Sequence, residues 1–385
     1  PNTRWKSCKK NKMKNIGIFS TTRGDMAILS PLITKLKKSK KLRPLFFVGG
    51  THLDKKYGST LNEIKLLNIN ITSFYTSKNK LVKDDPYNLS KLLSRDQSSL
   101  ANIFKKYKLD IICLVGDRFE KMALVMNAIL FKKKIIHLHG GEITLGSYDN
   151  EIRNMFSKAS NFHFVISNQY KNNLLNMGVN KKFIYNTGSL AIDNIRNIKK
   201  INKKTLFKKF KLDLNKKTCI LNYHPPSLDD KVKFQVQLKN ILLALKSFKL
   251  QIIITTPGLD SGRNEMLKMI NSVRKKDKNI KYIRSLGFKK FFSLIPFCEF
   301  VIGNSSSGII EVPYFKIPTI DIGRRQYGRL KHTSVISCNY SKSEIKKSLN
   351  LAMSKKFKHK LKNMKFHFGN GNASNKITKI LERII

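Results

Sequence analysis

The segment from residue 109 to residue 153 contains two strand-length apolar runs separated by a stretch of helical length. The runs are Leu109–Val115 and Ile135–Leu138, and the stretch between them is Phe119–Phe131. A strand, a helix and a strand at this spacing predict a βαβ unit with parallel strands. Because the crossover in such a unit is right-handed, both strands end at the same edge of the sheet. The pattern therefore predicts an α/β fold for this part of the chain.

Polar side chains follow both predicted strands at the points where they end. Asp117 and Arg118 come after the first strand, and His139 and Glu142 come after the second. We expect these side chains to project into one crevice, because open α/β sheets bind ligands outside the carboxyl ends of their strands. This cluster is the strongest indication of a functional site in the sequence.

Strand and helix alternate in the same way over most of the chain. Further strands are predicted at Ile16–Ser20, Pro44–Val48, Phe162–Ser167, Lys182–Gly188, Thr218–Tyr223, Leu250–Thr255, Ile280–Arg284, Phe300–Gly303 and Pro318–Ile322. This pattern predicts an α/β protein of two Rossmann-like, doubly wound domains with a cleft between them. The predicted bounds are a disordered basic extension at 1–12, domains at 13–195 and 205–365, a linker at 196–204, and a C-terminal helix within 366–385 that packs back on the first domain.

The charge of the chain is strongly positive, with 76 Lys and Arg residues against 24 Asp and Glu residues. The basic residues are scattered rather than clustered, so we interpret the charge as a compositional bias and expect no specific nucleic-acid partner. No run of 18 apolar residues occurs, so no membrane-spanning helix is expected. The five cysteines are far apart, which indicates reduced thiols in a cytoplasmic protein.

The second half of the chain carries a Ser-rich loop with the character of an anion site. Ser305 and Ser306 lie between two glycines, after a predicted strand and before a short helix. A helix start with hydroxyl groups binds phosphate well, although one serine would suffice as an ordinary cap. Glu311 follows, and it suits either ribose hydroxyls or a favourable charge near a helix N-terminus. Arg325, after the last predicted strand, suits a diphosphate.

Other polar residues indicate a functional site only because they share a position near strand ends. Arg23, His52 and His224 follow predicted strands, and each alone is a weak indication of a site. Asp149 and Arg153 are four residues apart on one face of a predicted helix, where a surface ion pair is the alternative reading. Neither a dinucleotide-binding G-x-G-x-x-G motif nor a P-loop motif is present.

As a set, these motifs resemble the hydrolysing UDP-N-acetylglucosamine 2-epimerases, in particular the bacterial branch that supplies sialic-acid and legionaminic-acid synthesis. The resemblance extends from about Lys14 to Gly328. The matching segments are TTRGD (21–25), THL (51–53), GDRFE (116–120), HLHGGEIT (137–144), DNEIR (149–153), NYHPPS (222–227), GNSSSGIIEVP (303–313) and GRRQYGR (323–329).

The resemblance implies a glycosyltransferase-B-like arrangement of the two domains, a homodimer, a UDP-sugar substrate, and neither a metal nor another cofactor. It also implies that a base removes the C2 proton of the sugar while nucleoside diphosphate leaves from C1. Water then adds to the resulting glycal, which gives N-acetylmannosamine and UDP.

By position, the resemblance makes Asp117, Glu142 and Asp149 acid/base carboxylates, with His139 beside them. It implies that Arg153 orients Asp149 and that His224 assists departure of the diphosphate. The residues implied to bind the substrate are Arg23, Arg118, His52, Ser305, Ser306, Glu311 and Arg325.

Three positions depart from the pattern of this family. Asn150 follows Asp149 where a second Asp is frequent, Asn154 stands where His is common, and Leu145 stands where Glu is frequent in the sialic-acid branch. Because these positions are expected near the sugar, two alternative substrates stay open: GDP-N-acetylglucosamine and a UDP-linked 2,4-diacetamido-trideoxyhexose. A less polar sugar pocket around Leu145 would suit the deoxy sugar.

Two other classes of protein remain as alternatives. A glycosyltransferase of the same architecture would also use a Ser-rich anion loop, but the carboxylates favour elimination chemistry. A polyanion-binding protein without catalytic activity would explain the charge and leave the strand-end motifs unexplained.

Overall fold

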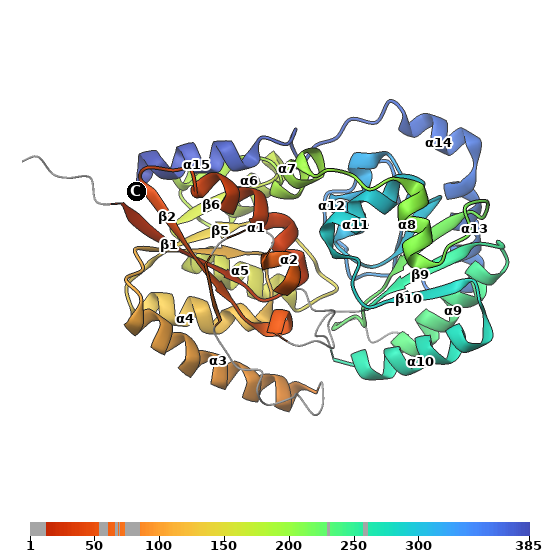
Figure 1. The fold of residues 1–385 in the computed structure, drawn as a ribbon, viewed down its shortest axis with the longest axis horizontal. Helices are drawn as coiled ribbons and strands as arrows, with labels where there is room; N and C mark the ends of the chain where they lie inside the picture. Colours follow the sequence, from red (N-terminus) through yellow and green to blue (C-terminus); the bar gives the residue numbers. More distant parts are fainter. Residues whose placement is uncertain are drawn as a thin grey trace, which may run out of the picture.

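The computed structural model describes residues 13–53, 61–65, 68, 70–73, 85–228, 232–256 and 261–385. The extension predicted at 1–12 lies outside these residues. Figure 1 shows two α/β halves side by side, each built on a sheet with helices on both faces. Among the helices of the described residues, none combines the length and the apolarity needed to cross a membrane.

The first half contains a parallel seven-stranded sheet in the order β3-β2-β1-β4-β5-β6-β7. Its strands are β1 (Lys14–Ser20), β2 (Leu42–Val48), β3 (Ile71–Ser73), β4 (Ile111–Val115), β5 (Lys134–Leu138), β6 (Phe162–Val165) and β7 (Ile184–Asn186). Its helices are α1 (Arg23–Leu36), α2 (Leu61–Lys65), α3 (Pro86–Lys106), α4 (Met122–Leu130), α5 (Asp149–Ala159), α6 (Asn168–Asn176) and α7 (Leu190–Asn197). The predicted βαβ unit is confirmed, since β4 and β5 pair in parallel with Val115 opposite Leu138.

The apolar run of β4 is continuous because both faces of the sheet are covered. Ile111, Cys113 and Val115 pack into one core with α1, whereas Ile112 and Leu114 pack into the opposite core with α3 and α4. Successive side chains of a strand point to opposite faces, so a strand buried on both faces needs an apolar residue at every position. The polar residues that follow β4 therefore mark the end of the strand sharply.

The second half contains a parallel six-stranded sheet in the order β10-β9-β8-β11-β12-β13. Its strands are β8 (Thr218–Asn222), β9 (Gln251–Thr255), β10 (Ile280–Ile283), β11 (Phe300–Gly303), β12 (Thr319–Ile322) and β13 (Val335–Cys338). Its helices are α8 (Lys203–Phe210), α9 (Phe234–Lys246), α10 (Arg263–Lys276), α11 (Gly287–Leu294), α12 (Ser307–Ile310), α13 (Lys342–Met353) and α14 (Lys355–Leu361).

The helical stretch predicted at Phe119–Phe131 begins differently from the expectation. A 3₁₀ turn, Phe119–Lys121, precedes α4. Lys121 turns back at this point, and its ammonium group donates to the carbonyl of Val115 at 2.7 Å and pairs with Asp25 at 2.8 Å. These buried contacts hold the tight turn.

The stretch predicted as a linker, 196–204, is helical only at its two ends. Helix α7 continues to Asn197 and α8 begins at Lys203, so only 198–202 has no regular structure. The Asn202 side chain accepts from the backbone N–H of Thr205 at 2.8 Å and caps α8. Residues 198–202 thus join α7 of the first half to α8, the first helix of the second half.

The last helix, α15 (Ala373–Ile384), lies on the first sheet and packs against α1 (Figure 1). Ile377 and Leu381 are buried in the core that covers one face of this sheet. The carboxylate of Asp193 accepts from the backbone N–H groups of Ala373 at 2.9 Å and Ser374 at 2.7 Å, at the start of the helix.

We expect Leu381→Ala to lower the free energy of unfolding by about 2–5 kcal/mol, because it leaves a cavity under α15. Urea denaturation followed by circular dichroism measures this change. Lys379→Ala, at an exposed position of the same helix, serves as the control and should leave the midpoint nearly unchanged. Equal midpoints for the two variants would contradict the packing of α15.

Candidate functional site

A cavity of about 300 Å³ lies between the two domains, at the carboxyl ends of the strands in both sheets. The strand order of the first sheet reverses between β1 and β4, and that of the second sheet reverses between β8 and β11. The loops that follow these four strands all contribute residues to the wall. Ligands of doubly wound sheets bind at such reversal points. Two of these binding positions therefore face each other across one cavity.

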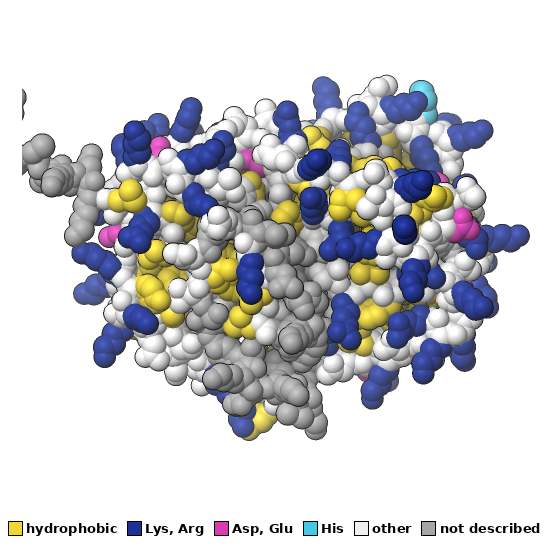
Figure 2. All heavy atoms as spheres, in the orientation of Figure 1, with side chains coloured by type: hydrophobic (Ala, Val, Ile, Leu, Met, Phe, Trp, Pro, Cys, Tyr) yellow, Lys and Arg dark blue, Asp and Glu magenta, His cyan; other side chains and the backbone are white. Residues whose placement is uncertain are grey.

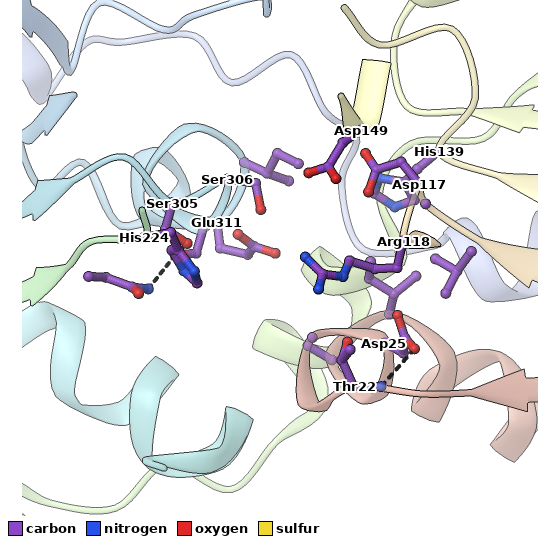
Figure 3. Close-up of a pocket in the computed structure, with 18 of the residues that line it drawn as sticks. Thr22, Asp25, Asp117, Arg118, His139, Asp149, His224, Ser305, Ser306 and Glu311 are labelled. Carbon is purple, nitrogen blue, oxygen red and sulfur yellow. Dashed lines mark hydrogen bonds between the residues drawn. The ribbon is translucent and has the colours of Figure 1, made fainter. Parts of the chain in front are cut away.

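Most of the side chains singled out from the sequence line this cavity. They are Asp117, Arg118, His139, Glu142 and Asp149 from the first domain, and His224, Ser305, Ser306, Glu311 and Arg325 from the second. Figure 3 shows the two groups on opposite sides, with Arg118 extending toward Glu311. Arg153 and His52 are not among the residues of the wall.

Arg153 lies behind the cavity wall and is almost fully buried. Its guanidinium group donates to the Glu142 carbonyl at 2.8 Å and to Thr144 Oγ1 at 3.0 Å, and it pairs with Asp117. The expectation that Arg153 orients Asp149 is therefore corrected. The guanidinium beside Asp149 belongs to Arg325, at 3.5 Å.

His52 is buried and does not line the cavity, whereas its neighbour Thr51 does. Its Nε2 atom lies 2.7 Å from the hydroxyl of Ser20. Burial lowers the pKa of His52 to about 4, so the ring is neutral near pH 7. The expectation of a direct substrate contact by His52 is corrected to a supporting position. Arg23 is the first residue of α1, and its side chain lies outside the described part of the chain.

Two carboxylates of the cluster are held in the ionised state. Burial alone would raise the pKa of Asp117, but the guanidinium groups of Arg153 and Arg329 hold it well below its usual range. Burial likewise opposes ionisation of Glu142, and Arg329 together with the hydrogen bond from His139 lowers its pKa. Opposite charges at short range outweigh desolvation at both positions.

The Ser-rich loop is organised by Asn304, which is nearly fully buried. Its side chain accepts from the backbone N–H of His224 at 2.8 Å and donates to the carbonyl of His224 at 2.8 Å. Its own carbonyl accepts from Arg325 at 3.0 Å and from Gln326 at 2.9 Å. Asn304 thus links the loops after β8, β11 and β12 and fixes the backbone of His224 beside the serines.

Glu311 is the residue that follows the last turn of α12. It also immediately precedes the 3₁₀ turn Val312–Phe315, so the reading as a charge near a helix N-terminus stays open beside the ribose reading. Burial raises the pKa of Glu311 to about 7, and its Oε2 atom has no hydrogen-bond partner among the described residues. A buried, unsatisfied oxygen beside a cavity is suited to accept hydrogen bonds from ligand hydroxyl groups.

Several wall residues were not singled out from the sequence. Leu286, Phe288 and Phe291 of the second domain and Ile28 of α1 are apolar residues of the wall. Arg329 also lines the cavity, and its presence in the GRRQYGR segment was the available signal.

Leu145 is more than half exposed and does not line the cavity, so the predicted sugar pocket around it is corrected. Its backbone N–H donates to the Tyr327 carbonyl at 3.0 Å, which joins the two domains at the cavity rim. Thr144 and Ser147, on either side of it, line the cavity instead.

The raised pKa of Glu311 predicts a pH-dependent stability. The folded protein keeps a proton up to about pH 7 that the unfolded chain releases near 4.5, so this group makes the free energy of unfolding fall as pH rises between these values. We expect Glu311→Gln, which cannot ionise, to raise the Tm relative to wild type more at about pH 8 than at about pH 5. Differential scanning calorimetry without nucleotide measures this, with exposed Glu265→Gln as the control. The same Tm difference at both pH values would contradict the buried carboxylate.

Comparison with solved structures finds the same fold. The UDP-GlcNAc 2-epimerase from Neisseria meningitidis bound to UDP-GlcNAc superposes with a TM-score of 0.78 at 20% identity, covering 96% of this chain and 100% of that chain. The Methanocaldococcus jannaschii UDP-GlcNAc 2-epimerase in complex with UDP-GlcNAc and UDP gives 0.79 at 20% identity, covering 96% and 99%. The expectation of two Rossmann-like domains in a glycosyltransferase-B-like arrangement is confirmed.

Sequence comparison identifies relatives along nearly the whole chain. A protein named GDP/UDP-N,N'-diacetylbacillosamine 2-epimerase (hydrolyzing), from Campylobacter jejuni, is 35% identical over 90% of this chain and 89% of its own length. The polysialic acid biosynthesis protein P7 of Escherichia coli is 30% identical over 90% of this chain and 88% of its own length. Residues 34–382 match the family described as UDP-N-acetylglucosamine 2-epimerase. The resemblance seen in the motifs is confirmed, and the chain belongs to the UDP-N-acetylglucosamine 2-epimerase family.

Proposed function

We propose that this protein is a hydrolysing 2-epimerase of UDP-sugars. The observation that carries the proposal is a single cavity in which three carboxylates, Asp117, Glu142 and Asp149, face a hydroxyl- and guanidinium-lined loop of the other domain. Acid/base groups on one side and an anion site on the other are what elimination of a nucleoside diphosphate requires.

The nucleotide is proposed to bind to the second domain. Ser305, Ser306 and Arg325 hold the diphosphate, and Glu311 accepts hydrogen bonds from the ribose. Arg118 reaches the same space from the first domain, and His224 assists departure of the diphosphate. Positive charge and hydroxyl donors at this position stabilise the charge that develops on the leaving group.

The reaction is proposed to run in two steps. A base removes the C2 proton, the C2–H electron pair forms the C1–C2 double bond, and the C1–O bond breaks as UDP leaves with its electrons. Water then adds its oxygen to C1 while C2 gains a proton on the opposite face. Asp117 and Glu142 are paired with arginines, and their pKa values are depressed. They therefore stay ionised and suit charge stabilisation better than proton transfer. Asp149, 3.5 Å from Arg325, is therefore our candidate for the C2 base.

The proposed sugar is an N-acetylated hexosamine. UDP-N-acetylglucosamine stood first on sequence motifs, and it would give N-acetylmannosamine. Two relatives named for N,N'-diacetylbacillosamine, 35% and 29% identical to this chain, favour the 2,4-diacetamido-trideoxyhexose instead. We propose the UDP-linked diacetamido sugar as the preferred substrate, whose product would supply nonulosonic-acid synthesis. The UDP- and GDP-linked forms of N-acetylglucosamine are the alternatives.

Proton NMR in deuterated water tests the function directly. We expect wild-type protein to convert UDP-N,N'-diacetylbacillosamine to UDP and a free sugar that carries deuterium at C2, because the removed proton exchanges with solvent. UDP-N-acetylglucosamine and GDP-N-acetylglucosamine in parallel reactions rank the three substrates. Release of UDP without deuterium at C2 would contradict the elimination step, and no turnover of any of the three would contradict the function.

Asp149→Asn provides the matched variant for this assay. We expect it to lose at least about 100-fold in turnover, because it removes the base while keeping the shape of the side chain. UDP binding, measured by calorimetry, should stay close to wild type. Wild-type turnover in this variant would remove Asp149 from the proposed role.

A glycosyltransferase is the alternative enzyme class. The same assay distinguishes it, because a transferase needs an acceptor and leaves C2 undeuterated. The polyanion-binding alternative gains no support from the surface, since Figure 2 shows Lys and Arg distributed over the visible face without a gathered patch.

We propose that the protein is a homodimer that associates through α4. This helix exposes Met126, Ile129 and Leu130, and the neighbouring α5 exposes Met155. Adjacent exposed apolar side chains of this size favour burial against another chain.

We expect Leu130→Asp to convert a dimer to a monomer, because the substitution would bury a charge in the interface. Light scattering coupled to size exclusion measures the mass. Leu351→Asp, which changes a similarly exposed leucine on α13, is the control and should leave the mass unchanged. A dimer that persists in Leu130→Asp would place the interface elsewhere.

A further inference from the structure

A short segment of the second domain, residues 327–330, docks on the first domain. The Tyr327 carbonyl accepts from the N–H of Leu145 at 3.0 Å, and the N–H of Leu330 donates to the Tyr170 hydroxyl at 3.1 Å. A Cβ atom on Gly328 would lie 2.5 Å from Ile143, so only glycine allows this approach. The backbone on both sides of Arg329 is therefore held by the first domain.

Docking of this segment brings the Arg329 side chain into the carboxylate cluster. Its guanidinium group pairs with Oε2 of Glu142 and lies 4.0 Å from Oδ2 of Asp117. The side chain is only 6% exposed, so the pairs are shielded from water. A buried guanidinium requires such partners, and removing one member leaves an uncompensated buried charge.

The other oxygen of Glu142 binds the imidazole of His139. Oε1 lies 3.0 Å from Nδ1, and because Glu142 is ionised, Nδ1 carries the proton and donates it. The remaining ring nitrogen, Nε2, is buried beside the cavity and has no hydrogen-bond partner among the described residues. A carboxylate on one ring nitrogen commonly sets the tautomer and orientation of a functional histidine.

The backbone around His139 is equally constrained. His139 has a φ of 65°, an uncommon conformation for a residue with a side chain. Its N–H donates to the Phe164 carbonyl at 3.1 Å. A Cβ on Gly141 would lie 2.3 Å from the Tyr170 carbonyl, which excludes any larger residue there. Strained backbone that the surrounding structure enforces is typical of functional positions.

We infer that Arg329 is a positioning residue: through Glu142, it fixes His139 in the tautomer that presents an unprotonated Nε2 to the cavity. Arg329 compensates the charge of Glu142, and the carboxylate accepts a hydrogen bond from Nδ1–H of His139. One oxygen of Glu142 then binds the histidine while the other pairs with Arg329. The residue comes from one domain and the histidine from the other, so the functional tautomer depends on their contact.

The catalytic consequence rests on the proposed function. In the second step, the unprotonated Nε2 of His139 would take a proton from the water whose oxygen bonds to C1. It would then pass this proton to C2, on the face opposite the one from which Asp149 removed a proton. The base that removes a proton and the acid that returns one to the other face must differ, because the product is the epimer. Asp149 and His139 are two groups of the first domain that line the cavity (Figure 3).

Nitrogen NMR of protein labelled with ¹⁵N-histidine tests the inference without a substrate. His139→Asn identifies the His139 signals. We expect wild type to show one tautomer with the proton on Nδ1, and Arg329→Gln to lose this single tautomer. An unchanged His139 tautomer in Arg329→Gln would overturn the inference. Should Arg329→Gln not fold, Arg329→Lys, which keeps the charge without the planar group, undergoes the same measurement and should show a mixed population.

Lys331→Gln is the matched control, because Lys331 pairs with Asp321 at 2.8 Å on the same loop but does not line the cavity. We expect the control to leave the His139 signals unchanged. An equal change in both variants would mean that any lost ion pair in this loop disturbs the site, and would overturn a specific role for Arg329.

Kinetics provide a second readout once a substrate has been found. We expect Arg329→Gln to lower kcat by about 100-fold with little change in KM, because a misplaced proton carrier slows the chemistry but not binding. Guanidinium chloride added to Arg329→Ala should restore part of kcat. A change confined to KM would overturn the positioning role. If wild type turns over no UDP-sugar, the proposed function fails, whereas the NMR measurement still decides the role of Arg329.

Discussion

The ion pairs between buried carboxylates and guanidinium groups are the interaction on which the site depends. Asp117 and Glu142 are too deeply buried to stay charged unaided, and Arg153 and Arg329 provide the compensating charge. Removing a charge from water costs several kcal/mol, and only close, well-placed partners offset this cost. Arg153 comes from the same domain as the carboxylates, whereas Arg329 comes from the other. Both domains thus supply positive charge that compensates the buried carboxylates.

Both domains can contribute residues to one site because each sheet presents its strand ends to the same cavity. Parallel strands buried on both faces leave few places for polar side chains except the loops that follow them. Asp117 and His139 follow neighbouring strands of one sheet, and Asn304 and Arg325 follow neighbouring strands of the other. Reversal of the strand order in each sheet opens a crevice at these ends. Positions far apart in the sequence therefore converge without any long functional loop.

Glycines decide how closely the two domains approach. A Cβ on Gly146 would lie 2.2 Å from the Arg324 carbonyl, and one on Gly328 would meet Ile143 at 2.5 Å. Each domain thus presents a bare backbone position where the other comes closest. Larger residues would force these loops apart and withdraw Arg325 and Arg329 from the carboxylates. The contact between these loops therefore also brings the guanidinium groups of Arg325 and Arg329 to the carboxylates.

The sequence by itself determined the α/β architecture and most of the site. Unbroken apolar runs such as Ile111–Val115 specify buried parallel strands, and the polar residues that follow them are local signals. For this reason Asp117, His139, Glu142 and the Ser-rich loop were identified without coordinates. Only the tertiary structure decided the partners: Arg153 binds Asp117 rather than Asp149, Thr51 replaces His52 at the wall, and Leu145 faces outward. Helical spacing and strand ends are set by short-range geometry, whereas the choice of an ion-pair partner depends on tertiary packing. For Arg153 this packing lies within the first domain, and for Arg325 and Arg329 it lies at the contact between the two domains. The contact between the domains joins residues nearly two hundred positions apart, such as Glu142 and Arg329, and no local pattern in the chain encodes it.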